Sequence, residues 1–270
     1  MSFKRFIANR ECGIVSPSLI NGSAMKTFHP KLDHNGQPVA LHSPSADSEP
    51  EAWLGESHVA TVTPGGRLPK AINGIPFSPW KDAPTTPTGW ENVPGQNDNL
   101  IEPMLHVGLN KHAAAGVVIE EPDGRVWVIH PSNAFGGYKA TFPKGTIEPS
   151  EDLSFQAVAI KEAFEESGLQ VAITGYLMDV ERTTSVCRYY RARRIGGTPA
   201  AMGWESQAVS LVPKDKLYSV LNRDVDHPLA KMVGAGLVSR KATAADSNGP
   251  SIPVPEGKPY LGTPMSSRRS

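Results

Sequence analysis

The strongest helical pattern in this chain spans Asp152–Ser167, and it lies among segments rich in β-forming residues. Its apolar side chains recur at i, i+4, i+7 and i+11, at Leu153, Ala157, Ile160 and Phe164. That spacing puts them in one stripe, which a helix must bury against another element. Gly168 follows directly, as is typical of the residue that ends a helix. The chain is therefore expected to build a domain in which this helix covers a sheet.

Segments on both sides of this helix predict strands. Ala113–Glu120 and Arg125–His130 are apolar runs joined by a Pro-Asp-Gly turn, so we expect them to form a hairpin. Further strands are expected at Tyr138–Phe142, Val171–Val180, Ser185–Arg194 and Gln207–Val212. Two short helices are expected at Pro213–Asn222 and Pro228–Val233. The fold class expected is a mixed α/β (α+β) domain, with a β-sheet flanked by helices.

Glycine and proline are abundant in this chain, and proline is distributed unevenly. There are 25 of each in 270 residues, and 18 of the prolines lie outside residues 111–237. Residues 36–50 and those from 239 onward hold few large apolar side chains, so they cannot bury enough surface to offset their ordering entropy. We therefore expect a low-complexity, poorly ordered region at 1–63, a folded domain at 111–237 and a disordered tail at 238–270.

Residues 64–110 differ because prolines alternate there with large apolar side chains, including Trp80 and Trp90. Tryptophans of this kind are unexpected in a disordered linker. We interpret the segment as an extended arm that packs on the folded domain. The alternative is an unstructured linker.

Charge and composition exclude several classes of protein. Lys plus Arg and Asp plus Glu both number 27, which argues against a basic face that grips duplex nucleic acid. No signal-peptide core and no run of about 18 apolar residues is visible, so we expect no membrane partner and a cytoplasmic location. Cys12 and Cys187 are too few for a disulfide framework and are interpreted as free thiols.

The strong helix also has an acidic face. Glu162, Glu165 and Glu166 stand at i, i+3 and i+4, so their carboxylates converge on one side. Like charges repel at that spacing, and a hard divalent cation such as Mg²⁺ or Mn²⁺ would reverse the repulsion. Taken alone, the three residues are more typical of a solvated acidic helix face than of a metal site.

A loop just upstream adds a second feature. Residues 142–149 read Phe-Pro-Lys-Gly-Thr-Ile-Glu-Pro, in which Lys144 supplies a cation and Gly145 lets the backbone approach a ligand closely. Together with Lys161–Leu169 (KEAFEESGL), this loop resembles the signature of the Nudix hydrolase family. That signature is a glycine, five residues, a glutamate, seven residues, and then Arg-Glu-apolar-x-Glu-Glu-x-Gly-apolar. The resemblance covers roughly residues 111–237 and implies a Nudix-like mixed sheet flanked by helices.

The sequence departs from this signature at two points. Lys161 stands in place of the usual arginine, which keeps the charge but loses the planar guanidinium. Nine residues separate Glu151 from Lys161, where the family has seven, so counting back from Lys161 reaches Leu153. Either two residues are inserted after Glu151, or Leu153 replaces the first glutamate of the signature.

The resemblance implies a metal-dependent pyrophosphohydrolase that acts on a nucleoside diphosphate linked to another moiety. Dinucleoside polyphosphates come first among the expected substrates, before ADP-ribose, nucleotide sugars and oxidised nucleoside triphosphates. The implied cofactor is Mg²⁺ or Mn²⁺, held by Gly145, Glu162, Glu165 and Glu166. The expected partner is a nucleotide-derived small molecule, and a homodimer is left open.

The remaining roles divide into two groups. The candidate catalytic residues are Glu162, Glu166 and Glu205, and the candidate substrate-binding residues are Lys144, Lys161 and Arg182. Trp204 and Tyr138 are both candidates for stacking on a base. The alternative function is a non-catalytic Nudix-like module that binds or senses a nucleotide, and a third is an interaction protein whose Pro-rich segments recruit partners.

Overall fold

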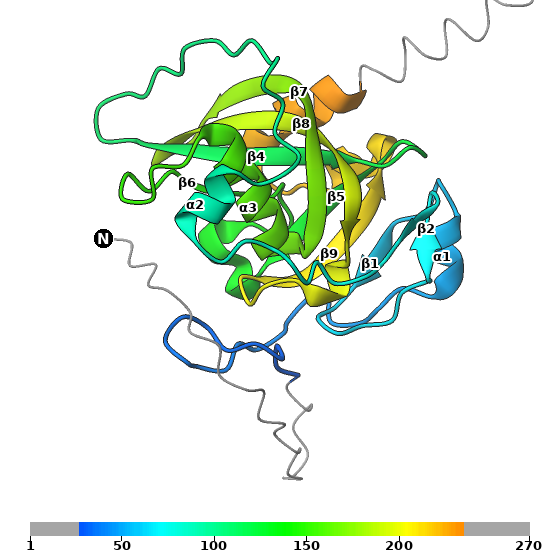
Figure 1. Ribbon diagram of the computed structural model, residues 1–270. Helices are drawn as coiled ribbons and strands as arrows, with labels where there is room; N and C mark the ends of the chain where they lie inside the picture. The colour runs from blue at the N-terminus through cyan, green and yellow to red at the C-terminus, as the bar shows by residue number, and fades with distance from the viewer. Residues whose placement is uncertain (1–26, 235–270) are drawn as a thin grey trace, which may run out of the picture. The chain divides into compact units, whose positions relative to one another are not determined.

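A computed structural model describes residues 27–234 of the chain, and within them a mixed sheet forms the centre of the fold (Figure 1). Its strands are β1 (Ala60–Val62), β4 (His112–Glu120), β5 (Arg125–Pro131), β6 (Lys144–Thr146), β7 (Leu169–Glu181), β8 (Ser185–Gly197) and β9 (Ser206–Pro213). They follow the order β1-β9-β5-β4-β8-β7, with β6 also paired to β4. The β4–β8 pair is parallel, and the other pairs of this sheet are antiparallel. The mixed α/β fold expected from the sequence is confirmed.

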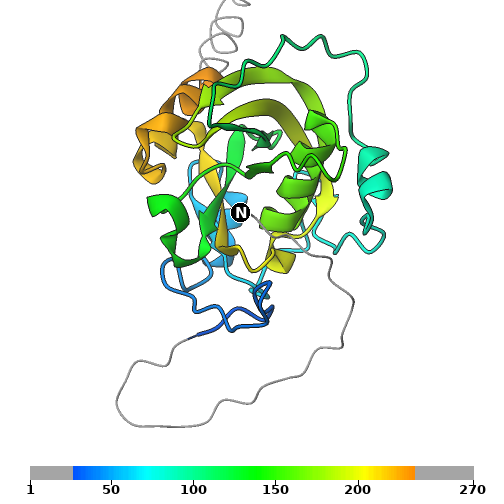
Figure 2. The same ribbon diagram turned by 90° about the vertical axis from the view of Figure 1, so that its left-hand side faces the viewer.

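The helices are α1 (Pro50–Leu54), α2 (Pro87–Glu91), α3 (Phe155–Ser167) and α4 (Leu217–Val220), and residues 227–234 are also helical. Helix α3 lies on one face of the sheet, and α4 lies on the other (Figures 1 and 2). Two consecutive residues of β4 show that the sheet has a buried core on each face, because successive side chains of a strand point to opposite faces. Val117 packs in the same core cluster as Ile160 of α3, whereas Val118 packs with Leu217 of α4.

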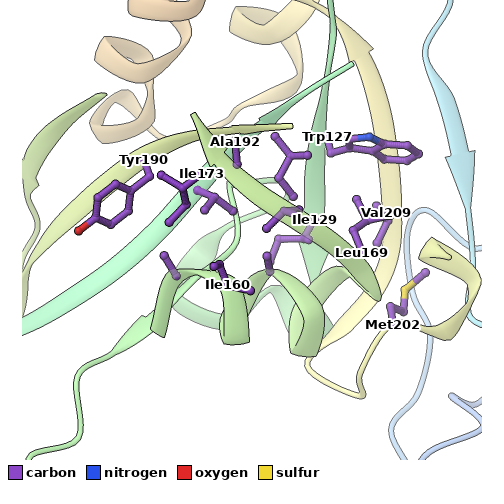
Figure 3. Packing of buried hydrophobic residues seen from close by; sticks show 14 of the residues in the cluster. Trp127, Ile129, Ile160, Leu169, Ile173, Tyr190, Ala192, Met202 and Val209 are labelled. Atoms are coloured by element: carbon purple, nitrogen blue, oxygen red, sulfur yellow. The ribbon is translucent and has the colours of Figure 1, made fainter. Parts of the chain in front are cut away.

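The larger core cluster lies between the sheet and α3 (Figure 3). Ile160 of α3 lies beneath Ile129 of β5 and Ile173 of β7, and all three side chains are 5% exposed or less. Burying side chains of this size is worth about 1.5–3 kcal/mol each. The packing fixes the face that α3 turns toward β4 and β6, which is where its glutamates lie.

Two sequence-predicted elements differ in the structure. Tyr138–Phe142 does not form a strand. Thr141 makes an isolated bridge to Ile129, and the strand β6 begins two residues after Phe142, at Lys144. The helix expected at Asp152–Ser167 begins at Phe155, because the Ser154 side chain caps it and Leu153 turns into the core. The other strands lie within a few residues of their predicted bounds.

The expected poor order of residues 1–63 is wrong for the described part, 27–63. Trp53 of α1 is 1% exposed, and β1 pairs with β9 through Thr61 opposite Ser210. Arg125 of β5 donates hydrogen bonds to the carbonyl oxygens of Trp53 (2.8 Å) and Ala52 (3.1 Å). A buried arginine and a buried tryptophan therefore order a segment whose composition predicts disorder.

Residues 64–110 contact the sheet and α3. A short hairpin there consists of β2 (Ala71–Ile72) and β3 (Ile75–Pro76). Trp80 and Trp90 lie edge to face with each other, at 5.9 Å between ring centroids, and the Phe164 ring of α3 lies 5.1 Å from Trp80. The N–H of Ile173 in β7 donates to the carbonyl oxygen of Gly95 at 2.8 Å. The described residues all belong to one compact unit, and the boundaries at 64, 111 and 238 stay predictions.

The predicted tail at 238–270, and the part of the N-terminal region at 1–26, lie outside the described residues. Within residues 27–234, no helix combines the length and the apolar character needed to span a membrane.

Candidate active site

Helix α3 presents two of its three glutamates to the interior of the protein. Ser154 accepts a hydrogen bond from the N–H of Ala157 at 3.2 Å, and Gly168 ends the helix in the left-handed conformation at φ 71°. Between these caps, Glu162 and Glu166 are one turn apart and only 2% and 8% exposed. Glu165 points to the exposed side of the helix. The structure therefore brings Glu162 and Glu166 together and leaves Glu165 on the exposed side of α3.

Gly145 lies against the carboxylate of Glu162. It is the central residue of β6 and pairs with Ala115 of β4. A Cβ at this position would overlap the Glu162 carboxyl group, so any other residue would force that side chain to move. The requirement for glycine here is one of space between β6 and α3. The structure thus puts Gly145, a predicted metal-binding residue, in contact with a predicted carboxylate ligand.

Glu166 is held by the backbone of the same strand. The N–H of Lys144 donates to Oε2 of Glu166 at 2.8 Å. Burial raises the pKa of Glu166 to about 8, the Lys144 charge opposes this shift, and the charges of Glu162 and Glu205 add to it. Glu166 therefore lies in a strongly acidic, desolvated environment.

The same electrostatic influence places Glu205 within range of Glu166. Glu205 is half-buried and precedes β9, and its carbonyl oxygen accepts from the N–H of Ser132 at 2.7 Å. The sequence-predicted catalytic residues Glu162, Glu166 and Glu205 are thus neighbours, although they come from α3 and from the turn before β9.

This donor set suits a hard divalent cation. Oxygen atoms are the ligands that Mg²⁺ and Mn²⁺ prefer, and a cation would offset the repulsion from Glu162 and Glu205, which adds to the effect of burial on the pKa of Glu166. In the part of the chain that the structure describes, no three His, Cys, Asp or Glu side chains are already arranged around a common cation position. The carboxylate oxygens of Glu162 and Glu166 are therefore donors of the chemical type that such a cation takes.

Lys161 and Glu151, the two residues at which the sequence departs from the signature, form an ion pair. Nζ of Lys161 lies 2.7 Å from Oε2 of Glu151, and the side chains are 11% and 25% exposed. The N–H of Glu151 donates to the carbonyl oxygen of Glu148, and Asp152 takes a positive φ of 51°. Glu151 and Asp152 thus lie in or next to the turn before α3, and Leu153 belongs to the core. Lys161 was expected to bind substrate, but its ammonium group is used to hold Glu151.

Arg182 also differs from its predicted role. It was expected to contact a substrate phosphate, but its side chain is 7% exposed and its guanidinium forms an ion pair with Asp226 at 2.5 Å. It also donates to the hydroxyl groups of Tyr138 and Tyr189, both at 2.7 Å. Because these contacts use its Nη atoms inside the protein, Arg182 ties the end of β7 to the C-terminal segment.

Tyr138 and Arg223 line a pocket that sequence reasoning did not define. The pocket has a volume of about 370 Å³, and Arg182 and Asn222 are also in its wall. Tyr138 was a candidate for base stacking, but nothing in the pattern around Arg223 indicates a site. Trp204, the other stacking candidate, lies 5.4 Å from the ring of His34.

Comparisons with known proteins identify a family for this region. The family model described as NUDIX domain matches residues 110–233. No curated protein matches the chain.

Solved structures with a similar fold include three from different organisms. A NUDIX hydrolase from Nitrosomonas europaea is 21% identical, over 47% of this chain and 72% of that chain, with a TM-score of 0.40. An ADP-ribose pyrophosphatase from Streptococcus suis is 19% identical, over 46% and 91% of the two chains, with a TM-score of 0.37. A C. elegans Ap4A hydrolase is 17% identical, over 47% and 98%, with a TM-score of 0.38.

Proposed function

We propose that this chain, a member of the Nudix hydrolase family, cleaves a nucleoside diphosphate linked to another moiety. The family membership makes it a hydrolase of phosphorus-containing acid anhydrides. The substrate classes proposed are dinucleoside polyphosphates, ADP-ribose and nucleotide sugars. One observation supports this best: the buried carboxylates Glu162 and Glu166 of α3 lie directly against the Lys144–Gly145 strand. An acidic site beside the backbone of Lys144 and Gly145, with the lysine charge nearby, suits a metal-bound phosphoanhydride.

Divalent metal ions are general in this family, and we propose Mg²⁺ or Mn²⁺ here. Glu162, Glu165, Glu166 and the carbonyl oxygen of Gly145 would hold the ion. When bound, it would neutralise charge on the phosphate oxygens and lower the pKa of a water molecule. The closeness of Gly145 to Glu162 supports this set of ligands.

The protein's own residues have separate tasks in the reaction. A water oxygen forms a bond to phosphorus, and the bond from that phosphorus to the bridging oxygen breaks. The water proton passes to a carboxylate, for which we propose Glu166 or Glu205, and the two phosphorylated fragments leave. The positive charge of Lys144 favours the ionised form of Glu166, because it lowers the pKa that burial raises. Lys161 acts by fixing Glu151 at the start of the helix.

Incubation of the full chain with a panel of nucleotide derivatives tests this function. The panel contains diadenosine tetraphosphate, ADP-ribose, UDP-glucose and ATP, each with Mg²⁺, with Mn²⁺ and with excess chelator, and the products are separated by chromatography. We expect cleavage of at least one linked diphosphate that stops when chelator is added. Saturable binding of these compounds without turnover would instead support the non-catalytic sensor module.

A further inference from the structure

A hairpin outside the Nudix domain packs against the turn that carries Glu205. Residues 27–43 form this hairpin, in which the N–H of His29 donates to the carbonyl oxygen of Val39 at 2.8 Å. Both side chains are only 4% exposed. The family model matches residues 110–233, so the 27–43 hairpin lies outside the part of the chain that the family shares.

The tip of the 27–43 hairpin contacts the first half of the turn, which comprises residues 199–206. Nζ of Lys31 donates to the carbonyl oxygen of Ala201 at 2.7 Å. The ring of His34 lies 5.4 Å from the ring of Trp204. Two side chains of the hairpin therefore hold the turn from outside the Nudix domain.

Gln207 joins the other end of the hairpin to the strand that follows the turn. Its Oε1 accepts from the N–H of His42 at 2.7 Å, and its Nε2 donates to the carbonyl oxygens of Ser43 and Pro131, both at 3.2 Å. Gln207 is 3% exposed, so removing its amide would leave backbone groups in the interior without their partner. One buried side chain thus links the hairpin, β5 and β9.

Gln207 is also the extra residue of a β-bulge. Two consecutive residues of β5, His130 and Pro131, pair with Ala208 and Ser206 of β9, which places Gln207 between the two pairs. A bulge bends its strand and changes the direction of the residues beside it. The hydrogen bonds of the Gln207 amide therefore fix the bend at which the turn enters β9.

The position of this turn decides where Glu205 lies relative to α3. The N–H of Ser132 donates to the carbonyl oxygen of Glu205 at 2.7 Å, and its Oγ donates to that of Trp204 at 2.6 Å. The charge of Glu205 reaches Glu166, whose pKa it helps to raise. A displacement of the turn would therefore move one candidate catalytic carboxylate away from the other.

We propose that Gln207 and the 27–43 hairpin form a positioning element, which holds the Glu205 carboxylate in place beside Glu166. The inference rests on the proposed function for the catalytic role of Glu205. Gln207 is a positioning residue that acts on the reaction only through Glu205. Its loss should therefore lower kcat and leave KM nearly unchanged.

A double-mutant cycle with Gln207→Met and Glu205→Gln tests this role. Methionine keeps the length of the side chain but makes none of the hydrogen bonds of the amide. With Mg²⁺ and the best substrate of the panel, we expect Gln207→Met to lower kcat about tenfold, because a carboxylate is misplaced. The same change should lower kcat by less than about twofold in Glu205→Gln, since the group that it positions is already altered. Equal falls in both backgrounds, or a wild-type kcat in either single variant, would overturn the inference and leave the proposed function in place.

Lys31→Met tests the hairpin without a change in the core. Lys31 is exposed, so the fold should be retained, and kcat should fall about threefold as the turn loses one of its contacts. Lys81→Met is the matched control, because Lys81 is an exposed lysine in residues 64–110 and its loss should have no effect. A kcat for Lys31→Met equal to that of Lys81→Met would remove the hairpin from the positioning element.

Hydrogen–deuterium exchange supplies a readout that does not depend on activity. In Gln207→Met and Lys31→Met, the amides of residues 199–206 should exchange faster than in the wild type, whereas those of α3 should not change. Unchanged exchange in the turn would overturn the inference. A wild-type protein that hydrolyses nothing in the panel would overturn the proposed function, and exchange in the turn would then decide by itself whether Gln207 and the hairpin hold it.

Discussion

Lys161 and Glu151 form an ion pair of 2.7 Å that closes the turn before α3. Glu151 is the glutamate whose spacing departs from the family signature, and the pair brings it back to the helix. In this turn Asp152 adopts φ 51°, a conformation that costs little in an Asp.

Replacing Lys161 with Gln should leave Glu151 without its cation. We expect a loss of about 1 kcal/mol in the free energy of unfolding, since the pair is partly buried, and a lower hydrolysis rate. Lys161→Arg should restore most of both. Urea denaturation of the two variants measures the effect, and equal stability of Lys161→Gln and the wild type would show that the pair is not structural.

Gly145→Ala should reduce metal binding more than it reduces stability. The new Cβ would displace the Glu162 carboxyl group, and we expect metal affinity to fall by about 10–100-fold, as it does when a ligand loses its support. Gly108→Ala is the control, because a Cβ there meets no atom within 4 Å. Titration with Mn²⁺ followed by electron paramagnetic resonance compares the variants, and similar affinities would contradict the placement of Gly145 in the metal site.

The buried, neutral His130 should make the free energy of unfolding fall at acidic pH. Burial lowers its pKa to about 4, and its ring is hydrogen-bonded to the carbonyl oxygen of Lys139 and to the Ser210 hydroxyl, both at 2.8 Å. The folded state favours the neutral ring, so its contribution is present above pH 6.5 and is lost as the pH falls from 6.5 to 4. The loss is about 3 kcal/mol at most for this shift.

His130→Gln isolates that contribution. The variant should lose stability less steeply than the wild type between pH 6.5 and 4 in urea denaturation. Burial also lowers the pKa of His29 to about 4, so part of the wild-type slope should remain. Identical slopes in the two proteins would show that His130 does not titrate in this range on unfolding.

We expect the packing of Trp90 against α3 to hold residues 64–110 on the sheet domain. Trp90 is 6% exposed and lies 6.1 Å from Phe164 of α3. Trp90→Ala should cost about 3–5 kcal/mol, and it should open the segment around Trp80 to limited proteolysis. Leu109→Ala is the control, because Leu109 is 96% exposed. A wild-type protein already cut rapidly near Trp80 would contradict the packing.

The central part of the fold follows from local patterns that one sequence contains. The stripe from Ala157 to Phe164, the Pro-Asp-Gly turn and Gly168 each reflect constraints between near neighbours, so they predict α3 and the β4–β5 hairpin. The carboxylates Glu162 and Glu166 are one turn apart on that helix, and their convergence follows from helix geometry.

Other features depend on residues far apart in sequence. Arg125 orders the segment around Trp53 from 72 residues away, and the local composition of that segment cannot predict this contact. Arg182 is drawn from its expected role by Asp226, at a separation of 44 residues. Arg223 becomes part of a pocket only because the C-terminal segment returns to Tyr138. Each of these required the tertiary structure.

The rate of hydrolysis by Glu166→Gln tests the account most directly. The amide keeps an acceptor for the N–H of Lys144, so the fold should be retained while a metal or base oxygen loses its charge. With Mg²⁺ and the best substrate of the panel, kcat/KM should fall at least about 100-fold, whereas Glu49→Gln, at an exposed position before α1, should match the wild type. A Glu166→Gln protein that hydrolyses the substrate within a few-fold of the wild-type rate would contradict the central claim.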